Sequence, residues 1–377
     1  MAHLRKLTKK TLIVVNAALG VVFLLACTNA YANPASWWMI SLLGLFFPLL
    51  LLLVFAFFIF WLFFPSRRLA LVSLLALAMG WSNIHAFFAF NIRKPPLTRK
   101  PADALRILTW NVHSWDEFIT SKPGASGHRG NMLEFIRQQD ADLLCFQEFF
   151  ESHNFRGLSS TISYITTQLH YPYYLFSRDF KRFDGQYESG DIIFSKYPIT
   201  DSLLVKFRVP HSTKYQESLL AIDLTVQGKK IRVFTTHLQS VLFQRRDFRN
   251  LEIIRNVDDS VLEASRSIVK KLKVAYASRS DQAKEVRHLL DQSPYPAIIC
   301  GDFNDIPNSY TYFHIRGDMQ DAFTKKGFGI GRTYVNLSPT LRIDYILVAK
   351  EFQVLQCSKF SIPYSDHHPV VADLRLL

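Results

Sequence analysis

Six short polar clusters lie in residues 105–377, each at or just after a short apolar run. Together they supply carboxylates, amides and histidines, which are the side chains that metal-dependent hydrolysis needs. A lone Gly-Asp-x-Asn or Asp-His would arise by chance, whereas six such clusters in one order form a specific pattern. The clusters occupy residues 109–113, 146–148, 235–238, 301–305, 342–345 and 365–370.

The candidate metal ligands are carboxylates and amides, because Mg²⁺ prefers oxygen ligands and is typically held by one or two carboxylates plus a substrate phosphate. Glu148 ends an apolar run and is the best single candidate. We expect Asn111 and Asp366 close to it, and Asp302 with Asn304 would complete a second metal position. Mn²⁺ would suit the same oxygen ligands. As isolated residues, Glu148 and Asn111 would more often be ordinary turn or surface groups, so this hypothesis depends on the whole set.

His367 is the candidate general base, because an imidazole can take a proton from water near neutral pH. Asp344 would hold the His367 ring in the right tautomer and stabilise the imidazolium as it forms. Water attack on phosphorus places negative charge on the equatorial oxygens, which donors held in place can stabilise. Asp302 would orient water or assist the leaving group. The candidate donors are Asn111, Asn304 and His237.

In their order, the six clusters resemble the endonuclease/exonuclease/phosphatase superfamily, whose members include DNase I, abasic-site endonucleases, inositol-polyphosphate 5-phosphatases and neutral sphingomyelinases. The resemblance covers residues 105–377 and implies a four-layer α/β sandwich, in which two packed mixed β-sheets are flanked by helices. It also implies that the histidine of the Ser-Asp-His motif, His367, is the base and is paired with the aspartate of the Asp-Tyr-Ile motif, Asp344. The family position of His368 varies, so we interpret His368 as a spacer.

Two histidines indicate which members of this superfamily the chain resembles more. DNase I, the 5-phosphatases and the sphingomyelinases carry a histidine at the position of His237, whereas abasic endonucleases carry asparagine. Abasic endonucleases also have an aspartate two residues after the asparagine of the first motif, where this chain has His113. His113 either contacts phosphate or metal or is a packed histidine at a strand end, and both alternatives stay open. Tyr187 is a further residue expected to line the site.

Apolar patterns predict alternating strands and helices in the same region. By themselves these patterns indicate only an α/β fold, with polar residues at the strand ends where α/β sheets usually bind ligands. The predicted helices are 129–139, 159–169 and 280–290. The predicted strands are 105–110, 142–146, 191–194, 218–226, 231–236, 297–300, 343–348 and 370–376.

The first hundred residues have a different composition, with ten Lys or Arg and no Asp or Glu, whereas the remainder has 34 basic and 31 acidic residues. The net charge of +13 therefore reports mainly the flanks of membrane helices rather than a nucleic-acid-binding surface. Residues 1–90 are predicted to hold three transmembrane helices, because a span needs about 20 apolar residues. The predicted spans are 11–32, 37–64 and 69–90, with a kink at Pro48.

The predicted topology places the catalytic domain outside the cytoplasm, in the periplasm of a Gram-negative cell. Arg5 to Lys10 and the Ser66-Arg67-Arg68 loop would lie inside, in agreement with the positive-inside rule. The first segment also resembles a cleavable secretory signal, but a plain membrane helix is favoured because another span follows almost at once. Residues 91–104 form a basic, proline-rich linker that would hold the domain within about 40 Å of the bilayer.

Two further features of the sequence can be interpreted in more than one way. The segment 240–279 is either a surface helix with one apolar face or a lid or membrane-contacting helix. Cys27, Cys145 and Cys300 are expected to be buried thiols rather than parts of a disulfide framework.

The leading functional hypothesis is a multi-pass membrane protein that hydrolyses a lipid or small-molecule phosphoester with Mg²⁺. Its expected partners are the lipid bilayer and the phosphoester, with no obligate protein partner. A DNase I-like nuclease is the alternative, although a soluble part with nearly balanced charge disfavours tight binding of a polyanion. A non-catalytic, membrane-tethered binding module is the third possibility, and the intact set of polar clusters argues against it.

Overall fold

The computed structural model describes residues 2–64, 66–92, 95, 100–117, 127–208, 216–241 and 261–377. The chain forms two compact units, each assembled from segments that are distant in sequence. The smaller unit contains Met1–Phe88, Ser240–Ala283 and Ile306–His314, and the larger unit contains Ala89–Gln239, Lys284–Asp305 and Ile315–Leu377.

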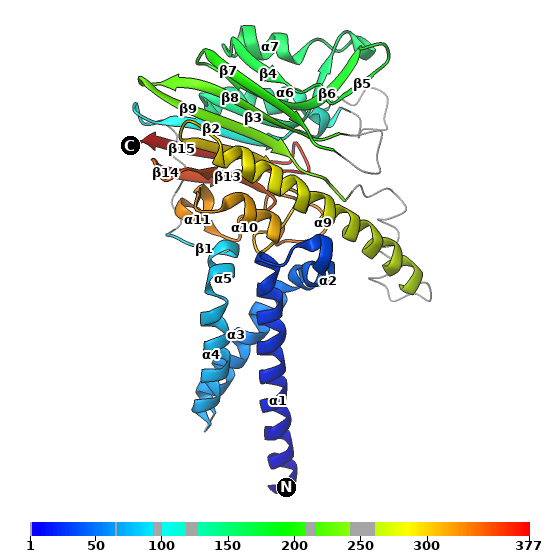
Figure 1. The fold of residues 1–377 in the computed structure, drawn as a ribbon, viewed down its shortest axis with the longest axis vertical. Coiled ribbons are helices and arrows are strands. Elements are labelled where there is room, and N and C mark those ends of the chain that lie inside the picture. The colour runs from blue at the N-terminus through cyan, green and yellow to red at the C-terminus, as the bar shows by residue number, and fades with distance from the viewer. Residues whose placement is uncertain are drawn as a thin grey trace. The chain divides into compact units, whose positions relative to one another are not determined.

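Two mixed β-sheets make up the larger unit (Figure 1). One has the order β11 (Gln320–Asp321), β13 (Asp344–Val348), β10 (Ala297–Asp302), β9 (Lys229–His237), β8 (Ser218–Val226) and β7 (Ile199–Lys206). The other has the order β14 (Phe352–Lys359), β15 (Val370–Leu376), β2 (Leu105–Asn111), β3 (Leu143–Ser152), β6 (Tyr187–Ser195) and β4 (Tyr173–Phe176), with β5 (Phe180–Arg182) paired to β6. The pairs β9–β10 and β2–β3 are parallel, and the other pairs in the two sheets are antiparallel.

Alternate residues of the strands build the core between the two sheets, because neighbouring side chains of a strand point to opposite faces. Ile107, Cys145 and Ile193 of one sheet pack in one buried cluster with residues such as Ile222 and Ile298 of the other. The opposite face of the β2–β3–β6 sheet is covered by α6 (Arg129–Gln139) and α7 (Thr161–Gln168) through a second cluster. The predicted architecture of packed mixed sheets flanked by helices is therefore confirmed.

Several predicted elements match closely, including 218–226, 370–376 and 129–139. The strands that the apolar pattern did not predict are short or lie at the sheet edges, where exposed residues weaken the alternation. They are β1 (Ala89–Phe90), β4, β5, β7, β11, β12 (Phe328–Gly329) and β14. The predicted helix 280–290 is the last part of α9 (Val261–Asp291), which begins much earlier.

The N-terminal part of the smaller unit is helical. Its helices are α1 (Ala2–Cys27), α2 (Pro34–Leu45), α3 (Phe47–Phe63), α4 (Ala70–Met79) and α5 (Trp81–Phe87). In the described residues one helix, Lys6–Ala30, is long and apolar enough to cross a membrane, and up to three spans result if each bent pair of helices counts as one. The α2–α3 pair bends by 54° and the Arg67–Met79 pair with α5 bends by 64°.

The bends correct two details of the predicted spans. Pro48 does not kink a continuous helix: the break lies at Phe46, and Pro48 occupies the first turn of α3, where its missing N–H costs nothing. The predicted third span also ends too late, because Ala89 and Phe90 form β1, which pairs with β12.

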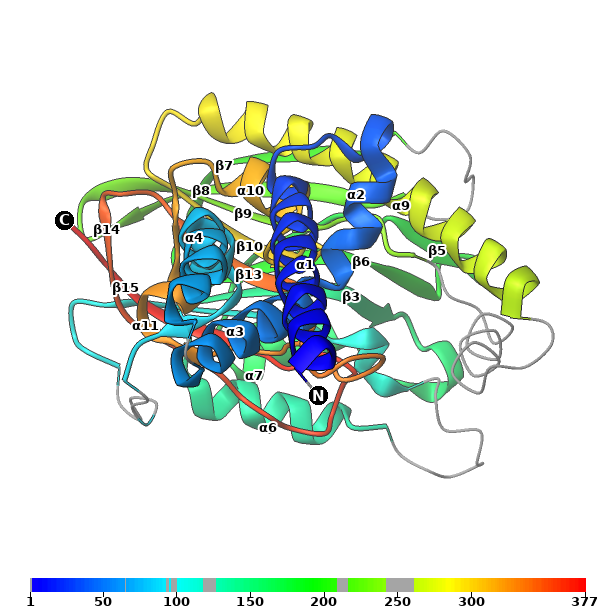
Figure 2. The ribbon, with the colours of Figure 1, turned by 90° about the horizontal axis from the view of Figure 1, so that it is seen from below.

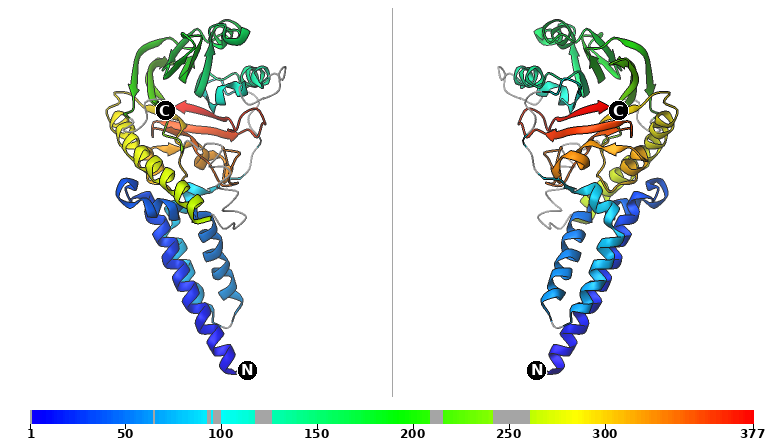
Figure 3. Two further views of the ribbon diagram at one scale, coloured as in Figure 1. Left: turned by 90° about the vertical axis from the view of Figure 1, so that its right-hand side faces the viewer. Right: turned by 90° about the vertical axis from the view of Figure 1, so that its left-hand side faces the viewer.

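Buried polar contacts join the helices of this unit, and Figures 2 and 3 show α1, α3 and α4 side by side. The Ser73 hydroxyl of α4 donates to Asn16 Oδ1 of α1 at 2.7 Å, and Asn83 Nδ2 of α5 donates to the Cys27 carbonyl at 3.0 Å. Gly80 lies where an added Cβ would be 2.6 Å from the Phe23 ring. Such hydrogen bonds and small residues are the usual means by which apolar helices associate within a bilayer.

The segment after β9 belongs partly to this smaller unit. Residues 242–260, which make up about half of the segment 240–279, lie outside the described residues. In the described part, Lys273 of α9 places its ammonium 5.3 Å from the centre of the Trp38 ring. Asn308 Nδ2 likewise donates to the Gly44 carbonyl at 3.4 Å.

A buried ion pair ties β2 to β15, the last strand of the larger unit. Arg106 donates through Nε and Nη2 to both carboxylate oxygens of Asp373, at 2.6 and 2.8 Å, and the side chains are 3% and 0% exposed. Arg106→Ala should lower the free energy of unfolding by about 3–5 kcal/mol, because Asp373 would remain buried without its partner. Thermal denaturation of the full-length protein in detergent measures this loss. Arg137→Ala, which removes the exposed pair with Glu134, should shift the midpoint little, and an equal shift for both variants would contradict the prediction.

Candidate active site

The strand register brings five of the polar clusters to one end of the two sheets. His237 ends β9 and is the register partner of Asp302 at the end of β10, which is paired in turn with Asp344 at the start of β13. In the other sheet, Asn111 ends β2 beside Gln147 of β3. Because β9–β10 and β2–β3 run parallel, their ends carry the polar residues to one edge.

Unusual backbone conformations aim several of these side chains. Glu148 lies at a bulge of β3 between Phe146 and Phe149 and has a φ of 50°, and Asn304 has a φ of 51°. Non-glycine residues in this left-handed region cost about 1–2 kcal/mol each, and such strain concentrates at functional sites. Gly301 has a φ of 139°, and a Cβ there would lie 2.0 Å from the Thr236 carbonyl oxygen, so the approach of β10 to β9 requires glycine.

Two carboxylates converge on one amide. Asn111 Nδ2 donates to Glu148 Oε1 and to Asp302 Oδ2, both at 3.1 Å. His237 Nε2 lies 3.9 Å from the same Glu148 oxygen and 3.7 Å from the same Asp302 oxygen. This nitrogen is buried and has no hydrogen-bond partner among the described residues. The Glu148 side chain is 37% exposed, so this group of atoms is open to solvent on one side.

A histidine–aspartate pair lies next to these carboxylates. His367 Nδ1 is 2.9 Å from Asp344 Oδ2, and His367 Nε2 is 3.6 Å from Asp302 Oδ2. The backbone around His367 is held by Trp110, whose indole N–H donates to the His367 carbonyl at 2.8 Å. The Tyr334 ring lies 4.9 Å from the imidazole. Since Nδ1 of His367 contacts Asp344, Nε2 of the same ring is directed at Asp302.

The electrostatics of the cluster are dominated by its carboxylates. Burial alone would lower the pKa of His367, but Asp344 and Asp302 outweigh it and raise that pKa to about 10. Asp302 and Glu148 similarly overcome burial and raise the pKa of His237 to about 9. Burial together with Asp344 raises the pKa of Asp302 to about 6. Burial would also raise the pKa of Glu148, but the neighbouring histidines, His237 first, outweigh burial and lower it.

This donor set fits a divalent cation. Glu148 and Asp302 offer hard oxygen atoms close together, and a cation beside them would lower the pKa of both histidines towards neutrality. Asp302, Asp344 and His367 also offer ligand atoms that lie within 4.8 Å of one another. Because Asp344 and the imidazole already face each other, we regard Glu148 and Asp302 as the better place for an ion.

The remaining predicted residues lie around this cluster. Asp366 lies at its rim, where its Oδ1 is 3.5 Å from His113 Nδ1. His113 follows directly on the end of β2 and donates its backbone N–H to Asn111 Oδ1, so both alternatives for its ring stay open. Asn304 donates its backbone N–H to Asp302 Oδ1, while its side-chain amide is directed to the Leu238 carbonyl.

Two further observations concern residues outside the central cluster. Tyr187 stacks on Phe150 with ring centres 4.7 Å apart, in an aromatic cluster with Phe155. Tyr334 is a neighbour of His367 that sequence reasoning missed. It lies in an irregular segment without apolar periodicity, so no sequence signal could have identified it.

Comparisons with known families and solved structures concern the family and the fold of this chain. A family model of the endonuclease/exonuclease/phosphatase family matches residues 108–367, and a model described as a domain of unknown function (DUF8431) matches residues 9–87. No curated protein matches the chain.

An endonuclease/exonuclease/phosphatase from Beutenbergia cavernae DSM 12333 is 19% identical, with 74% of this chain and 72% of that chain covered and a TM-score of 0.52. The catalytic domain of human Nocturnin with bound sulfate is 18% identical, with 74% and 97% covered and a TM-score of 0.51. These two likenesses concern the fold. The family match spans more than half of the chain, which therefore belongs to the endonuclease/exonuclease/phosphatase family.

Proposed function

We propose that this protein is a membrane-anchored, Mg²⁺-dependent phosphoesterase. Members of its family are typically hydrolases of phosphoester bonds, and the chain carries the side chains that such a reaction needs. The convergence of Glu148 and Asp302 on the Asn111 amide, next to the His367–Asp344 pair, is the observation that carries the proposal.

The metal would be held by Glu148 and Asp302, with Asn111, Asn304 and Asp366 as the other proposed ligands. When bound, a divalent cation supplies positive charge to the phosphoryl oxygens and lowers the pKa of a bound water. Mg²⁺ is the first choice because the donors are hard oxygen atoms, and Mn²⁺ accepts the same ligands.

The protein's own groups would then move the proton and stabilise the charge. His367 Nε2 takes the proton of the attacking water, while Asp344 holds Nδ1 and stabilises the imidazolium. We expect His237 and Asn111 to donate to the phosphoryl oxygens, whose negative charge grows in the transition state. Asp302, the second carboxylate of the site, would orient water or assist the departing oxygen.

The membrane arrangement is part of the proposal. We expect the N-terminal helices to form three spans, with residues 105–377 as the catalytic domain on the extracytoplasmic side. A reporter fused at Ser66 should therefore behave as cytoplasmic, and one fused after Leu377 as extracytoplasmic, because Arg67 and Arg68 mark the inner loop. Alkaline phosphatase and a fluorescent protein as paired reporters measure the two positions. If the reporter after Leu377 behaved as cytoplasmic, the argument for a substrate on the extracytoplasmic face of this membrane would no longer hold.

One activity panel tests the chemistry. The full-length protein in detergent would be incubated with Mg²⁺ and lipid phosphodiesters, inositol or sugar phosphates, single-stranded DNA and RNA. We expect hydrolysis of a lipid or small-molecule ester and weak activity on the polynucleotides. Preferred cleavage of DNA would instead establish the nuclease alternative, and binding of a substrate without any hydrolysis would favour a non-catalytic module.

A further inference from the structure

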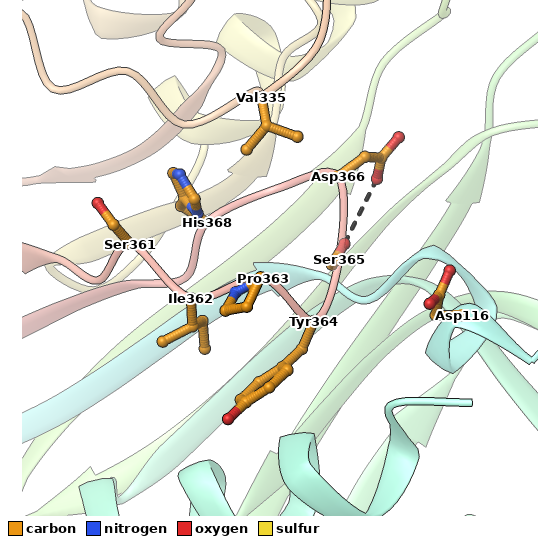
Figure 4. Close-up of a pocket in the computed structure, with 9 residues that line it drawn as sticks. All are labelled: Asp116, Val335, Ser361, Ile362, Pro363, Tyr364, Ser365, Asp366 and His368. Carbon is orange, nitrogen blue, oxygen red and sulfur yellow. Dashed lines mark hydrogen bonds between the residues drawn. The ribbon is translucent and has the colours of Figure 1, made fainter. Parts of the chain in front are cut away.

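A pocket of about 600 Å³ lies beside the candidate metal centre. Volumes of roughly 300–1,000 Å³ are typical of sites for small organic ligands. Figure 4 shows Ile362, Pro363 and Tyr364 in succession along the loop before β15, with Val335 on the opposite side. Ser365 and Asp366 form the edge of the pocket on the side of the candidate metal centre.

At this edge, Ser365 is hydrogen-bonded to two residues of the candidate site. The Ser365 hydroxyl donates to the Asn111 carbonyl at 2.8 Å and accepts the His367 backbone N–H at 3.1 Å. Asp366 is both a lining residue of the pocket and a proposed metal ligand. A group bonded to a phosphorus atom at the centre could therefore extend past Asp366 into the pocket.

A strained turn builds the neighbouring wall. His113, Ser114, Trp115 and Asp116 are four consecutive non-glycine residues with φ between 44° and 61°. The turn is held by Trp115, which is fully buried, packs edge-on against Phe146 and Phe149, and donates its indole N–H to the Phe150 carbonyl. Such strain persists only where the surroundings impose it, and it is typical of ligand sites. Here it places Asp116 at the pocket.

Further contacts connect this wall to the loop before β15. Asp116 Oδ2 lies 3.6 Å from His128 Nε2, and the His128 ring lies over the Tyr364 ring with centres 5.5 Å apart. Asp116 and Tyr364 are thus connected through one histidine, so the strained turn and the apolar loop form a continuous boundary.

The chemistry of the lining restricts the occupant. Ile362, Pro363, Tyr364 and Val335 offer apolar surface, and the charged side chains among the described lining residues are the carboxylates of Asp116 and Asp366. None of these described lining residues is Lys or Arg, which a second phosphate would need. We propose that the pocket receives the organic group of the phosphoester, and that this group is compact, largely apolar and free of a second phosphate. The inference rests on the proposed phosphoesterase function, and a polynucleotide strand suits such a pocket poorly.

The test measures binding, so it needs no turnover. Diphenyl phosphate carries one phosphate and two compact apolar groups, and calorimetry with the full-length protein and Mg²⁺ gives its Kd. Ile362→Asn should weaken binding about tenfold, because small changes of apolar contact in a pocket typically alter discrimination by tenfold or more. Ile162→Asn is the matched control, since Ile162 is packed in the same partly buried way against the same cluster but does not line the pocket.

A second variant tests the charge of the wall. Asp116→Asn keeps a residue that tolerates the left-handed conformation and removes one negative charge. It should tighten binding of a thymidine oligonucleotide by roughly threefold or more, and by a larger factor than it tightens binding of diphenyl phosphate, which brings no second phosphate to the pocket.

Three results would overturn the proposal: no binding of diphenyl phosphate, equal effects of Ile362→Asn and Ile162→Asn, or tighter binding of the oligonucleotide than of diphenyl phosphate by the wild type. The proposed function fails separately, if diphenyl phosphate binds as expected but no phosphoester is hydrolysed in the presence of Mg²⁺.

Discussion

Glu148→Gln is expected to abolish hydrolysis while leaving the protein folded. The neutral amide loses the charge that would hold Mg²⁺ at the point where Glu148 Oε1 and Asp302 Oδ2 face the same amide. Loss of residues that only support metal ligands already costs about 10–100-fold, so removal of a ligand should cost at least about 10²-fold in kcat/KM. Steady-state kinetics on whichever ester the panel identifies measure the loss.

The fold itself should tolerate this change. Glu148 is partly exposed, and the loss of its attraction to the neighbouring histidines is offset in part by relief of repulsion at Asp302. Thermal denaturation should therefore show a midpoint close to that of the wild type. Glu134→Gln, the same substitution at an exposed position of α6, should leave activity intact.

Chelation provides an independent arm of the same prediction. A chelator should remove the activity of the wild type, and added Mg²⁺ or Mn²⁺ should restore it. Activity that persists in the chelator, or a Glu148→Gln variant with wild-type kinetics, would contradict the metal site as drawn.

Sequence patterns identified the residues of the site better than they identified its geometry. The polar clusters end apolar runs, and parallel strands such as β9 and β10 carry such ends to one edge of a sheet. His237 and Asp302 could therefore be expected to lie side by side. The pairing of His367 with Asp344 came from the family resemblance, and in the structure the two side chains are 2.9 Å apart.

The details that aim the side chains depend on interactions distant in sequence. The bulge at Glu148 exists only because β6 pairs with β3 on both sides of it. The left-handed turn after Asn111 exists because Trp115 is buried among rings of β3, and isolated residues of these types rarely adopt that conformation. Neither the bulge at Glu148 nor the left-handed turn after Asn111 can be predicted from local conformational propensity.

The helical part shows a similar limit. Composition predicted apolar helices in residues 1–90, but it did not locate the break at Phe46 or the bend near Gly80, where an added Cβ would meet the Phe23 ring. The length of α9 was also not predicted, because residues 240–279 and 280–290 were interpreted as two separate segments. Edge strands such as β7 alternate mainly between exposed and half-buried residues, so their apolar pattern is weak.

His367→Ala is expected to lower kcat far more than it changes KM, because proton abstraction is needed only on the way to the transition state. Loss of a general base typically costs about 10²–10⁴-fold. His367 is buried against Asp344, so the alanine variant also leaves that carboxylate without its partner. His367→Gln keeps a hydrogen-bond donor near Asp344 and should show the same loss of kcat with a smaller loss of stability. His288→Ala, on an exposed part of α9, is the control for histidine removal.

Asp344→Asn should cost a similar order of kcat, because an amide no longer selects the tautomer of His367 or stabilises the imidazolium. The double variant should lose little beyond His367→Ala alone, since two residues that act as one unit give strongly non-additive effects. Single-turnover rates and Kd values for all four proteins of this cycle measure the coupling. Additive losses would mean that Asp344 acts independently of the base, for example through the ion that its carboxylate could hold with Asp302. A His367→Gln variant with nearly wild-type kcat would assign the proton transfer to another group, and His237, whose Nε2 faces the same Asp302 oxygen, would then be the next residue to test.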